Sequence, residues 1–381
     1  MMGKKYNNKL KVAFLGGGLN SAVGSAHYAA INLDNIYELV AGVFSTHKEI
    51  NYQTAEKYKV PKERVYDNLD ELVKNEKNNI DAIIVLTPTN QHATQVIELI
   101  KYGIPIICEK SLSTSIKETI EIEKTLNKNN GFLAVIFNYL GYPIIRELKH
   151  LIAIGRLGKI NHIQIEMPQE GFARITNEGN PIIPQKWRMK DNRVPTISLD
   201  LGVHLHMFIK YLTNETPISV VAQSNSYGNF SSIVDNVNCI IEYTNGLSCN
   251  MWYSKVAIGE RNGLKIRVYG QDGSAEWIQQ NPEILYCADS IGKRWTIDRG
   301  NESLEICNEQ RYTRFKAGHP AGFIEAFANY YYDIANALRI YKKTGNIEFR
   351  ECFGINESYE GMKLFEAIDK STKSKSWENA S

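Results

Sequence analysis

The sequence predicts an α/β chain of two domains, the first built on a helix-covered parallel sheet and the second on a mostly antiparallel sheet. Residues 10–137 alternate short apolar runs with helical patterns, which is typical of a parallel sheet covered on both faces. From residue 160 onward the apolar residues alternate with period two and helices are few, as in an antiparallel sheet. The length of 381 residues also fits two domains, at ~100–200 residues each.

Strands and helices are expected to alternate along the first domain. The strands are predicted at 11–16, 38–44, 81–86, 104–108 and 132–137. The helices are predicted at 22–33, 49–58, 68–76, 90–102 and 114–128. Because ligands of such sheets bind beyond the carboxyl ends of the strands, the residues that follow each strand are the first candidates for a binding site.

The stretch from Lys11 to His27, KVAFLGGGLNSAVGSAH, has the order strand, glycine-rich turn and helix. The glycines let the backbone approach a pyrophosphate, whose charge then faces the N–H groups and the positive dipole end of the helix. Gly16 and Gly18 fit the fingerprint G-x-G-x-x-G of a dinucleotide site, whereas position 21 is Ser and the next glycine is Gly24. A plain strand-to-helix turn is the alternative.

The second strand end carries Ser45, Thr46, His47 and Lys48, with no carboxylate before Glu49. A dinucleotide site usually has Asp or Glu here to hold the ribose 2′-OH. Hydroxyls beside Lys48 are compatible with a 2′-phosphate, and Ser45 is compatible with the ribose of NAD. The sequence therefore leaves NAD and NADP both open, with an ordinary polar loop as the alternative for His47 and Lys48.

Two further strand ends are expected at the same edge of the sheet. Thr87-Pro88-Thr89-Asn90 leads from a strand into a helix, with Thr89 or Asn90 as the N-cap. Glu109-Lys110 follows the strand at 104–108, which places Lys110 beside the nicotinamide if the glycine turn holds the pyrophosphate. A solvated surface lysine is the alternative.

The second domain is predicted to be a series of hairpins. Its strands are expected at 160–168, 218–225, 235–244, 247–256, 264–269, 274–279 and 283–288. Asn245-Gly246 joins two of them through the strongest short-range hairpin signal, and Asp272-Gly273 is expected to join another pair. Met251, Tyr253 and Trp277 are candidates either for an oligomer face or for the core. Two helices are expected to close the chain, at 320–341 with Pro320 as its first residue and at 355–371, followed by a surface tail.

Asp200 and His204 are four residues apart in a helix predicted over 198–214, so they share one face of it. That spacing lets a carboxylate hold one imidazole nitrogen while the other faces a substrate, which suits a general base. Gly202 lowers helix stability, which suggests that something such as a cofactor ring approaches it closely. A pair on the helix surface is the alternative, and His206 is expected to be structural or substrate-lining.

Composition argues against several classes of function. The formal charge is +2, from 44 basic and 42 acidic residues, and no long basic block predicts binding to nucleic acid or to a membrane surface. The six cysteines form neither a C-x-x-C pair nor a cluster with His, so a disulfide framework and a metal site are not expected, and a cytoplasmic location fits. The polar start MMGKKYNNKLK lacks the apolar core of a signal peptide.

Four motifs together resemble the glucose–fructose oxidoreductase, inositol dehydrogenase and rhizopine-catabolism (Gfo/Idh/MocA) family. They are the turn GGGLNSAVG, TPTNQH at 86–92 with its strand end, the doublet Glu109-Lys110 and FNYLGYP at 137–143. The family's EKP motif is similar to Glu109-Lys110-Ser111, with serine in place of proline. Its D-x-G-x-H element is similar to Asp200, Gly202 and His204, whereas Met207 stands where many members have a further Asp.

The resemblance implies a Rossmann NAD(P)-binding domain over residues 1–140 and an α/β domain over 141–381 with a large, mostly antiparallel open sheet, the last helices being candidates to pack back on the first domain. It implies a dehydrogenase that uses NAD or NADP, with NAD favoured, on a polyol, sugar or nucleotide-sugar. His204 is the expected acid/base, Asp200 orients it and Lys110 stabilises the alkoxide; no metal is implied.

The resemblance also implies which residues bind each ligand. The residues expected to bind the cofactor are Gly16, Gly18, Leu19, Asn20, Ser45, Thr46, Lys48, Thr87, Pro88, Thr89, Asn90, His92, Glu109, Lys110 and Asn138. The residues expected to line the substrate site are Tyr139, Tyr142, Gln169, Trp187, Arg188 and His204. Each of the first five has a structural alternative; Arg188, for example, meets a substrate anion or pairs with Glu170 or Asp191.

Two other functions stay open on the same fold. One is a nucleotide-sensing regulator without catalysis, against which the joint presence of Lys110, Asp200 and His204 argues. The other is an oxidoreductase that keeps its cofactor bound and recycles it between two sugars. In either case a homodimer or homotetramer through the sheet of the second domain is expected, with a small carbohydrate as the ligand and no nucleic-acid or membrane partner.

Overall fold

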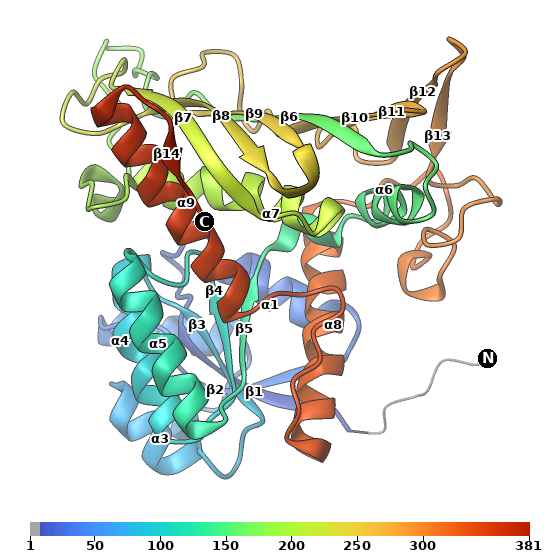
Figure 1. Cartoon of the computed structure of the whole chain (residues 1–381). Helices are drawn as coiled ribbons and strands as arrows, with labels where there is room; N and C mark the ends of the chain where they lie inside the picture. Colours follow the sequence, from blue (N-terminus) through green and yellow to red (C-terminus); the bar gives the residue numbers. More distant parts are fainter. Residues whose placement is uncertain (1–7) are drawn as a thin grey trace. The chain divides into compact units, whose positions relative to one another are not determined.

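Five parallel strands form the sheet of the first unit, in the order β2-β1-β3-β4-β5, in a computed structural model that describes residues 8–381 (Figure 1). All five are fully or almost fully buried, as their apolar runs predict. Their bounds are Leu10–Gly16 for β1, Tyr37–Val43 for β2, Ala82–Leu86 for β3, Ile106–Glu109 for β4 and Leu133–Ile136 for β5. The predicted parallel sheet is confirmed.

Helices cover both faces of this sheet, with α3, α4 and α5 on one side and α1 and α8 on the other (Figure 1). The first five helices are α1 at Gly24–Leu33, α2 at Lys48–Lys57, α3 at Leu69–Glu76, α4 at Thr89–Lys101 and α5 at Ile116–Asn129. Each lies within two residues of its predicted bounds. Helix α8, Phe323–Thr344, comes from far along the chain.

Helix α8 belongs to the same compact unit as the parallel sheet. That unit consists of the chain up to Ser113, Lys117–Gly141 and Phe323–Ser358. His27 of α1 lies edge-on to Phe327, with ring centroids 4.8 Å apart, and its Nδ1 is 2.8 Å from the Tyr331 hydroxyl. The late helix therefore supplies part of the core against which α1 packs.

Nine strands form the sheet of the second unit, in the order β13-β12-β11-β10-β6-β9-β8-β7-β14. Strands β6 and β9 run parallel, and the other neighbouring pairs are antiparallel, which confirms the mostly antiparallel sheet. The predicted strands are β6 Ile160–Pro168, β7 Pro217–Asn225, β8 Asn236–Tyr243, β9 Ser248–Ser254, β10 Lys265–Gly270, β11 Gly273–Ile278 and β12 Ile284–Asp289. The unit consists of Thr114–Ile116, Tyr142–Gly322 and Tyr359–Ser381.

Both predicted hairpins are confirmed. Asn245 and Gly246 have φ of 57° and 76° between β8 and β9, the left-handed conformation that this dipeptide favours. Asp272-Gly273 lies at the turn between β10 and β11. Two strands were not predicted, β13 at Arg294–Asp298 and β14 at Glu378–Asn379. The prediction of a surface tail is wrong in part, because β14 pairs with β7 and Ala380 is buried.

The sheet of the second unit buries one face against helices. Met251, Tyr253 and Trp277 are at most 1% exposed, so they belong to the core and not to an oligomer face. Helices α6, Pro143–Ala153, and α7, Val203–Thr213, lie along this side of the sheet (Figure 1). Trp277 contacts Phe208 of α7, with ring centroids 5.9 Å apart.

Two helix predictions need correction. Helix α8 begins at Phe323, so Pro320 lies before it and is not its first residue. The helix predicted over 198–214 begins with η4, a π-helix at Ser198–Gly202, and continues as α7. Helix α9, Ile355–Ser374, runs three residues beyond its predicted end. Across residues 8–381, no helix combines the length and the apolar composition that crossing a membrane requires.

Candidate active site

The glycine-rich turn between β1 and α1 is closely packed. Gly16 has φ +87°, and a Cβ on Gly18 would lie 2.8 Å from the Phe44 carbonyl oxygen. A Cβ on Gly24 would lie 2.1 Å from the Gly17 carbonyl oxygen, so Gly24 takes the part of the third fingerprint glycine, which lets the helix approach the turn. Ser21 instead accepts hydrogen bonds from the N–H groups of Val23 and Gly24, at 3.3 Å each, where α1 begins. Leu19 is exposed at the turn, and its N–H donates to Thr54.

The loop after β2 is fixed by Asn51. Its side-chain oxygen accepts hydrogen bonds from the N–H groups of Phe44 and Ser45, at 2.7 and 3.4 Å. Thr46 and Lys48 are exposed, and α2 begins at Lys48. The loop therefore presents hydroxyls, a helix N-terminus and a lysine at this strand end, with Glu49 in the first turn of the helix.

His92 joins the turns that follow β3 and β4. Its ring nitrogens lie 2.7 Å from the carbonyl oxygens of Thr87 and Ser111, and the side chain is 1% exposed. Burial lowers the pKa of His92, although both carbonyl oxygens favour the protonated form. The His92 ring therefore links the turn after β3 to the turn after β4. The N-cap prediction is wrong, because Thr89 is already the first helical residue and Pro88 is the N-cap.

Glu109 and Lys110 end β4 at the same edge. The Glu109 carboxylate is buried and lies 3.1 Å from the His27 Nε2, so α1 and β4 are linked beside the glycine turn. Lys110 is half-buried, and the peptide bond between Lys110 and Ser111 is cis. The carboxyl edge of the sheet thereby gathers the predicted residues of the glycine turn, the β2 loop, the β3 turn and the β4 end.

The short helix η2, Asn138–Gly141, follows β5. The Asn138 side-chain nitrogen is buried and has no hydrogen-bond partner among the described residues. A buried amide donor without a partner is costly, so a bound group with an acceptor at this position is favoured. Together with the glycine turn, this donor fits a dinucleotide at the edge. Tyr139 is half-buried and packs against Phe323 of α8, with ring centroids 5.9 Å apart.

In the second unit, Asp200 is held between two cations. Its Oδ2 lies 2.8 Å from the Lys255 Nζ and 3.1 Å from the Arg188 Nε. The side chains of Asp200 and Lys255 are each 7% exposed, whereas that of Arg188 is 27% exposed. The expected partners of Arg188, Glu170 and Asp191, are thus replaced by Asp200, and Arg188 also stacks over the Trp187 ring at 4.7 Å.

The π-helix changes the relation between Asp200 and His204. A π-turn is wider than an α-turn, so residues four apart no longer share one face as strictly as the spacing predicts. His204 is buried in the first turn of α7. The close approach expected at Gly202 is confirmed, and its neighbours are aromatic rings of the same unit, because a Cβ there would lie 2.9 Å from the Phe365 ring and 3.2 Å from the Tyr253 ring.

A chain of polar side chains leads away from Asp200. The Lys255 ammonium donates to Gln169 at 3.2 Å, and the Gln169 amide donates to Asn262 at 2.9 Å. Asn262 donates to Gln279, whose amide donates to the Tyr142 hydroxyl at 3.1 Å. Tyr142, expected at the substrate, is buried and packs against Trp277, with ring centroids 5.2 Å apart.

Lys255, Asn262 and Gln279 are the members of this chain that sequence reasoning missed. Each was predicted inside or next to a strand, and nothing in a strand pattern shows which polar side chains meet across neighbouring strands. Their common signal is their position: Lys255 follows β9, Asn262 precedes β10 and Gln279 follows β11. Polar residues at strand ends of one sheet are the pattern that would have found them.

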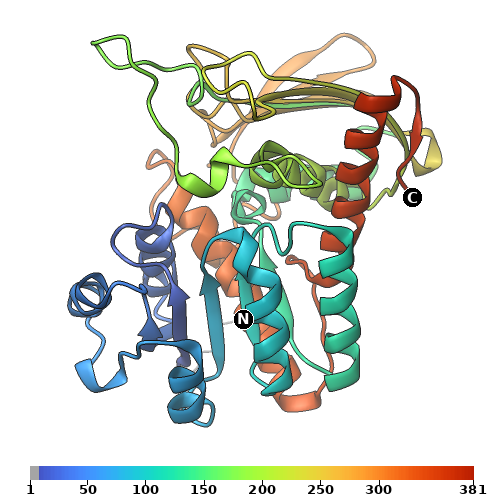
Figure 2. The same cartoon turned by 90° about the vertical axis from the view of Figure 1, so that its left-hand side faces the viewer.

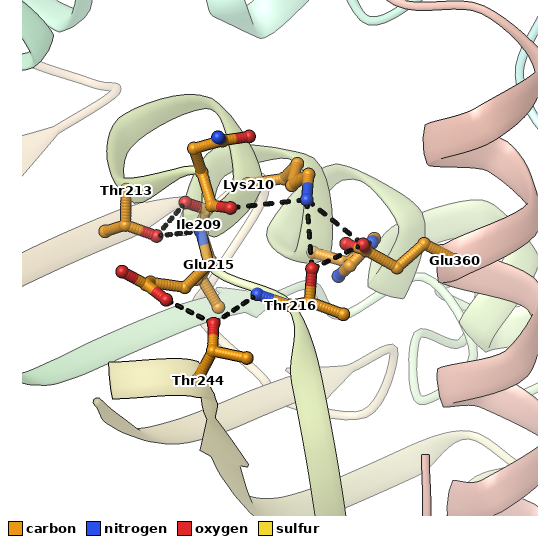
Figure 3. Close-up of polar contacts among 9 residues, drawn as sticks. Ile209, Lys210, Thr213, Glu215, Thr216, Thr244 and Glu360 are labelled. Atoms are coloured by element: carbon orange, nitrogen blue, oxygen red, sulfur yellow. Dashed lines mark hydrogen bonds and ion pairs between the residues drawn. The ribbon is translucent and has the colours of Figure 1, made fainter. Parts of the chain in front are cut away.

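Further along α7, Lys210 forms polar contacts with Glu360 of α9 and with Thr216, the residue before β7 (Figure 3). The Lys210 ammonium lies 3.1 Å from a Glu360 carboxylate oxygen, which also accepts a hydrogen bond from Thr216 at 3.0 Å. Burial lowers the pKa of His206 to about 3, and the Lys210 charge adds to the effect. The imidazole of His206 is therefore neutral at neutral pH, and Lys210 is the cation that pairs with Glu360.

The loop that carries Trp187 and Arg188 is an extended excursion between β6 and η4 (Figure 2). It contains the short helix η3, Lys186–Met189. Trp187 donates a hydrogen bond to Gln185 at 2.9 Å, so this aromatic side chain is fixed within the loop. Within the described residues, no group of three or more His, Cys, Asp or Glu side chains is arranged to hold a metal ion.

The predicted residues fall into two groups. One group lies in the first unit and runs from Gly16 to Tyr139; the other lies in the second unit and contains Tyr142, Gln169, Trp187, Arg188, Asp200 and His204. Within the second group, Arg188 and Asp200 are in contact, and Lys255 links Asp200 to Gln169.

Comparisons with known proteins agree with this arrangement. Residues 10–137 match the sequence model described as an oxidoreductase family with an NAD-binding Rossmann fold, and residues 145–276 match the GFO/IDH/MocA C-terminal domain. The uncharacterized oxidoreductase YfiI of Bacillus subtilis is 28% identical over 86% of this chain and 85% of that protein. The scyllo-inositol 2-dehydrogenase (NADP(+)) IolW of the same organism is 23% identical over 72% of this chain and 70% of that protein.

A solved structure is similar along almost the whole chain. The inositol dehydrogenase homolog from Azotobacter vinelandii, complexed with NADH and myo-inositol, has 25% identity and a TM-score of 0.88 over 98% of both chains. The two family matches together span more than half of the sequence, and their order is that of the two sheets. The chain is therefore a member of the Gfo/Idh/MocA family of oxidoreductases, with an NAD-binding Rossmann domain.

Proposed function

We propose that the protein is an NAD(P)-dependent dehydrogenase that interconverts a secondary alcohol and a ketone on a sugar, a polyol such as an inositol, or a nucleotide-sugar. The observation that carries the proposal is the position of Lys110 at the carboxyl end of β4, the edge where the glycine turn and the Asn138 amide favour a dinucleotide. The names of similar proteins, inositol dehydrogenases among them, support the substrate class.

Each side chain has one task in this proposal. In the oxidative direction His204 takes the hydroxyl proton on an imidazole nitrogen as the hydroxyl becomes a carbonyl. The Lys110 ammonium donates a hydrogen bond to the same oxygen, where negative charge develops, and Asp200 orients His204 and stabilises its protonated form. A nicotinamide held at this edge would supply the acceptor for the hydride that leaves the carbon bearing this oxygen. In the reverse direction His204 returns the proton.

The remaining predicted residues divide between cofactor and substrate. Gly16, Gly18, Leu19 and Asn20 are proposed to hold the pyrophosphate, and Ser45, Thr46 and Lys48 the adenosine ribose. Thr87 to Asn90, Glu109 and Asn138 are proposed to surround the nicotinamide, with His92 fixing their turns. NAD is the proposed cofactor. Tyr139, Gln169, Trp187 and Arg188 are proposed to line the substrate site, and Tyr142 supports it from the core.

The proposal is tested with a panel of polyols, aldoses and nucleotide-sugars, each offered with NAD and with NADP. On the best substrate, Lys110→Ala and His204→Ala are expected to turn over at less than about one hundredth of the wild-type rate, because alkoxide stabilisation and proton transfer each contribute about a hundredfold or more. Reduced-cofactor absorbance measures turnover, and calorimetry measures cofactor binding, which should be retained.

The control is Lys101→Ala, which removes an exposed lysine at the end of α4 in the same unit. Near-normal turnover by either site variant would show that the role assigned to that residue is wrong. Cofactor binding without turnover of any substrate would favour the regulator. Absorbance of NADH in the freshly purified protein, together with exchange between two sugars, would favour the enzyme with a permanently bound cofactor.

We further propose that the outer face of the nine-stranded sheet pairs with a second copy of the chain. Ile240 of β8 and Tyr269 of β10 are 47% and 40% exposed there, and the half-buried Trp252 lies on β9, between these two strands in the sheet order. This face is hollowed by a cavity of about 610 Å³ lined by β6, β7, β8, β9 and β10. Glu166 and Arg267 lie on the same face and form ion pairs within the chain, with Lys265 and Glu276, so the exposed apolar side chains are what a two-fold related copy would cover.

A further inference from the structure

We propose that Lys255 is a positioning residue of the catalytic machinery, which fixes Asp200 in the ionised form and in the place from which it orients His204. This inference rests on the proposed function, since it assigns a task to Asp200 beside the general base. It adds a residue that neither the D-x-G-x-H element nor the Lys110 doublet contains.

The contact between Lys255 and Asp200 is the first support. The Lys255 Nζ lies 2.8 Å from the Asp200 Oδ2, and each side chain is 7% exposed. A buried carboxylate is costly unless a charge or several hydrogen bonds compensate it, so the removal of a buried partner has a far larger effect than the loss of a surface pair. Lys255 is therefore in a position to decide whether Asp200 is charged.

The fixation of Lys255 itself is the second support. Its ammonium donates to Gln169 at 3.2 Å and lies 5.4 Å from the centre of the Phe172 ring. Gln169 is held in turn by Asn262 at 2.9 Å. The long lysine side chain thus has its end fixed on three sides by Asp200, Gln169 and Phe172, which is the property that a residue needs in order to place another.

The position of Asp200 explains why such support is needed. It lies in the π-helix η4, whose wider turn does not by itself set the direction of residue 200 relative to His204 on α7. Arg188 is the second cation on Asp200, at 3.1 Å, but its side chain is 27% exposed and it comes from the long loop. Lys255 follows β9, a strand in the middle of the sheet whose last two residues, Tyr253 and Ser254, are buried.

The charged groups around Asp200 determine in which direction the pH profile of kcat should move when Lys255 is replaced. Those in contact with Asp200 include Lys255 after β9 and Arg188 from η3, and His204 follows one turn further along the helix. Loss of the Lys255 charge makes protonation of the Asp200–His204 pair easier. The free base that alcohol oxidation requires is then present only at higher pH, so the acid limb of the kcat profile moves to higher pH.

The test compares Lys255→Met, Lys255→Arg and the wild type in kcat and KM between pH 5 and 10. Lys255→Met should lower kcat about tenfold or more at neutral pH, move the acid limb upward by about one pH unit and leave KM for the cofactor unchanged. Lys255→Arg keeps the charge and should restore the pH profile. The matched control is Lys373→Met, which breaks an ion pair with Asp369 on the surface of the same unit and should leave the profile unchanged.

A second measurement, which needs no substrate turnover, tests this inference independently of the proposed function. Nitrogen-15 NMR of labelled histidine, assigned with a His204→Asn variant, follows the titration of His204 in the wild type and in Lys255→Met. An upward shift of that titration supports the inference even if no substrate of the panel is turned over. A Lys255→Met variant whose titration and kcat profile coincide with those of Lys373→Met overturns it. A rise in substrate KM alone also overturns it, because it would mean that Lys255 contacts the substrate.

Discussion

At the scale of single residues, burial decides which titratable side chains carry charge. His206 is fully buried in α7, where its Nε2 lies 3.5 Å from a Glu360 carboxylate oxygen, and neither ring nitrogen makes a hydrogen bond among the described residues. Burial lowers its pKa to about 3, with a further contribution from Lys210. Asp200 is equally secluded but lies between two cations, and Glu109 faces His27. The second unit therefore holds a neutral histidine two residues from the proposed general base.

The lowered pKa of His206 predicts how stability depends on pH. Above pH ~6.5, the pKa of a histidine in the unfolded chain, His206 is neutral in both the folded and the unfolded state. Its titration then does not change the free energy of unfolding. As the pH falls from 6.5 toward 3, His206 becomes protonated in the unfolded chain but stays neutral in the folded one. The free energy of unfolding therefore falls by up to about 1.4 kcal/mol per pH unit. His206→Leu should remove this contribution, so its free energy of unfolding should fall less steeply over the same range.

Urea denaturation at half-unit steps of pH measures that slope. His47→Gln, at an exposed position at the start of α2, is the control and should follow the wild type. Parallel curves for His206→Leu and the wild type below pH 6.5 would show that His206 is protonated in the folded protein.

The residues that the sequence could identify are those whose chemistry is local. Lys110 stands directly after a strand, and Asp200 and His204 are separated by one helical turn, so spacing alone draws attention to them. Lys255 lies 55 residues beyond Asp200, and their contact depends on the register of β9 beside η4, which no local pattern encodes. The family resemblance named Asn138, but that its amide nitrogen has no partner among the described residues depends on the fold around η2.

At the scale of elements, apolar periodicity predicts most strands and helices, since burial of one face dominates their formation. The two missed strands lie at the edges of the nine-stranded sheet, where this signal is weakest. β13 alternates between exposed and half-exposed residues, and β14 has two residues. The π-helix η4 was also missed, because it spans only five residues, too few for their spacing to separate a π-helix from the first turn of an α-helix.

The packing of Gly202 gives a prediction at this scale. Gly202 has helical φ and ψ of −55° and −38°, so alanine suits its backbone, yet a Cβ would lie 2.9 Å from the Phe365 ring of α9. Gly202→Ala should therefore lower the free energy of unfolding by about 1–3 kcal/mol, because the rigid ring cannot yield without moving the helix. Chemical denaturation of the purified variant measures the loss.

A Phe365→Leu background tests whether the Phe365 ring causes the loss of stability in Gly202→Ala. If the ring is the obstacle, Gly202→Ala should cost less in the Phe365→Leu background than in the wild type, which a double-mutant cycle reveals. Additive effects, together with a specific loss of cofactor affinity, would instead revive the idea that a cofactor approaches Gly202.

At the scale of the whole molecule, the two faces of the large sheet differ. The inner face is filled by side chains such as Trp277 and Tyr253, which are fully buried. The outer face exposes Ile240, Tyr269 and Tyr286 beside amides and charges, to an extent of 39–47% each. Scattered apolar residues are common on monomers, but a hollowed sheet face that carries several of them marks an interface.

We expect the protein to sediment as a dimer or tetramer and Ile240→Lys to dissociate it, because a lysine at the centre of a packed interface leaves a buried charge unpaired. Size-exclusion chromatography with light scattering over a hundredfold range of concentration measures the mass. Ile291→Lys, at an 87% exposed position in the turn after β12, is the control and should assemble normally. A wild-type protein that stays monomeric at every concentration would contradict the second-copy proposal.

The position of α8 in the chain has a consequence for how the protein is made. The helix that supplies Phe327 and Tyr331 to the surroundings of His27 is encoded about 300 residues after it. During synthesis the ribosome has released the glycine turn and all five parallel strands long before this helix emerges. The nascent nucleotide-binding module therefore lacks the helix that packs against α1 while β6 to β13 of the large sheet are translated, and only β14 follows α8. A gene fragment that stops after β5 encodes every strand of that module and still lacks the piece that closes it.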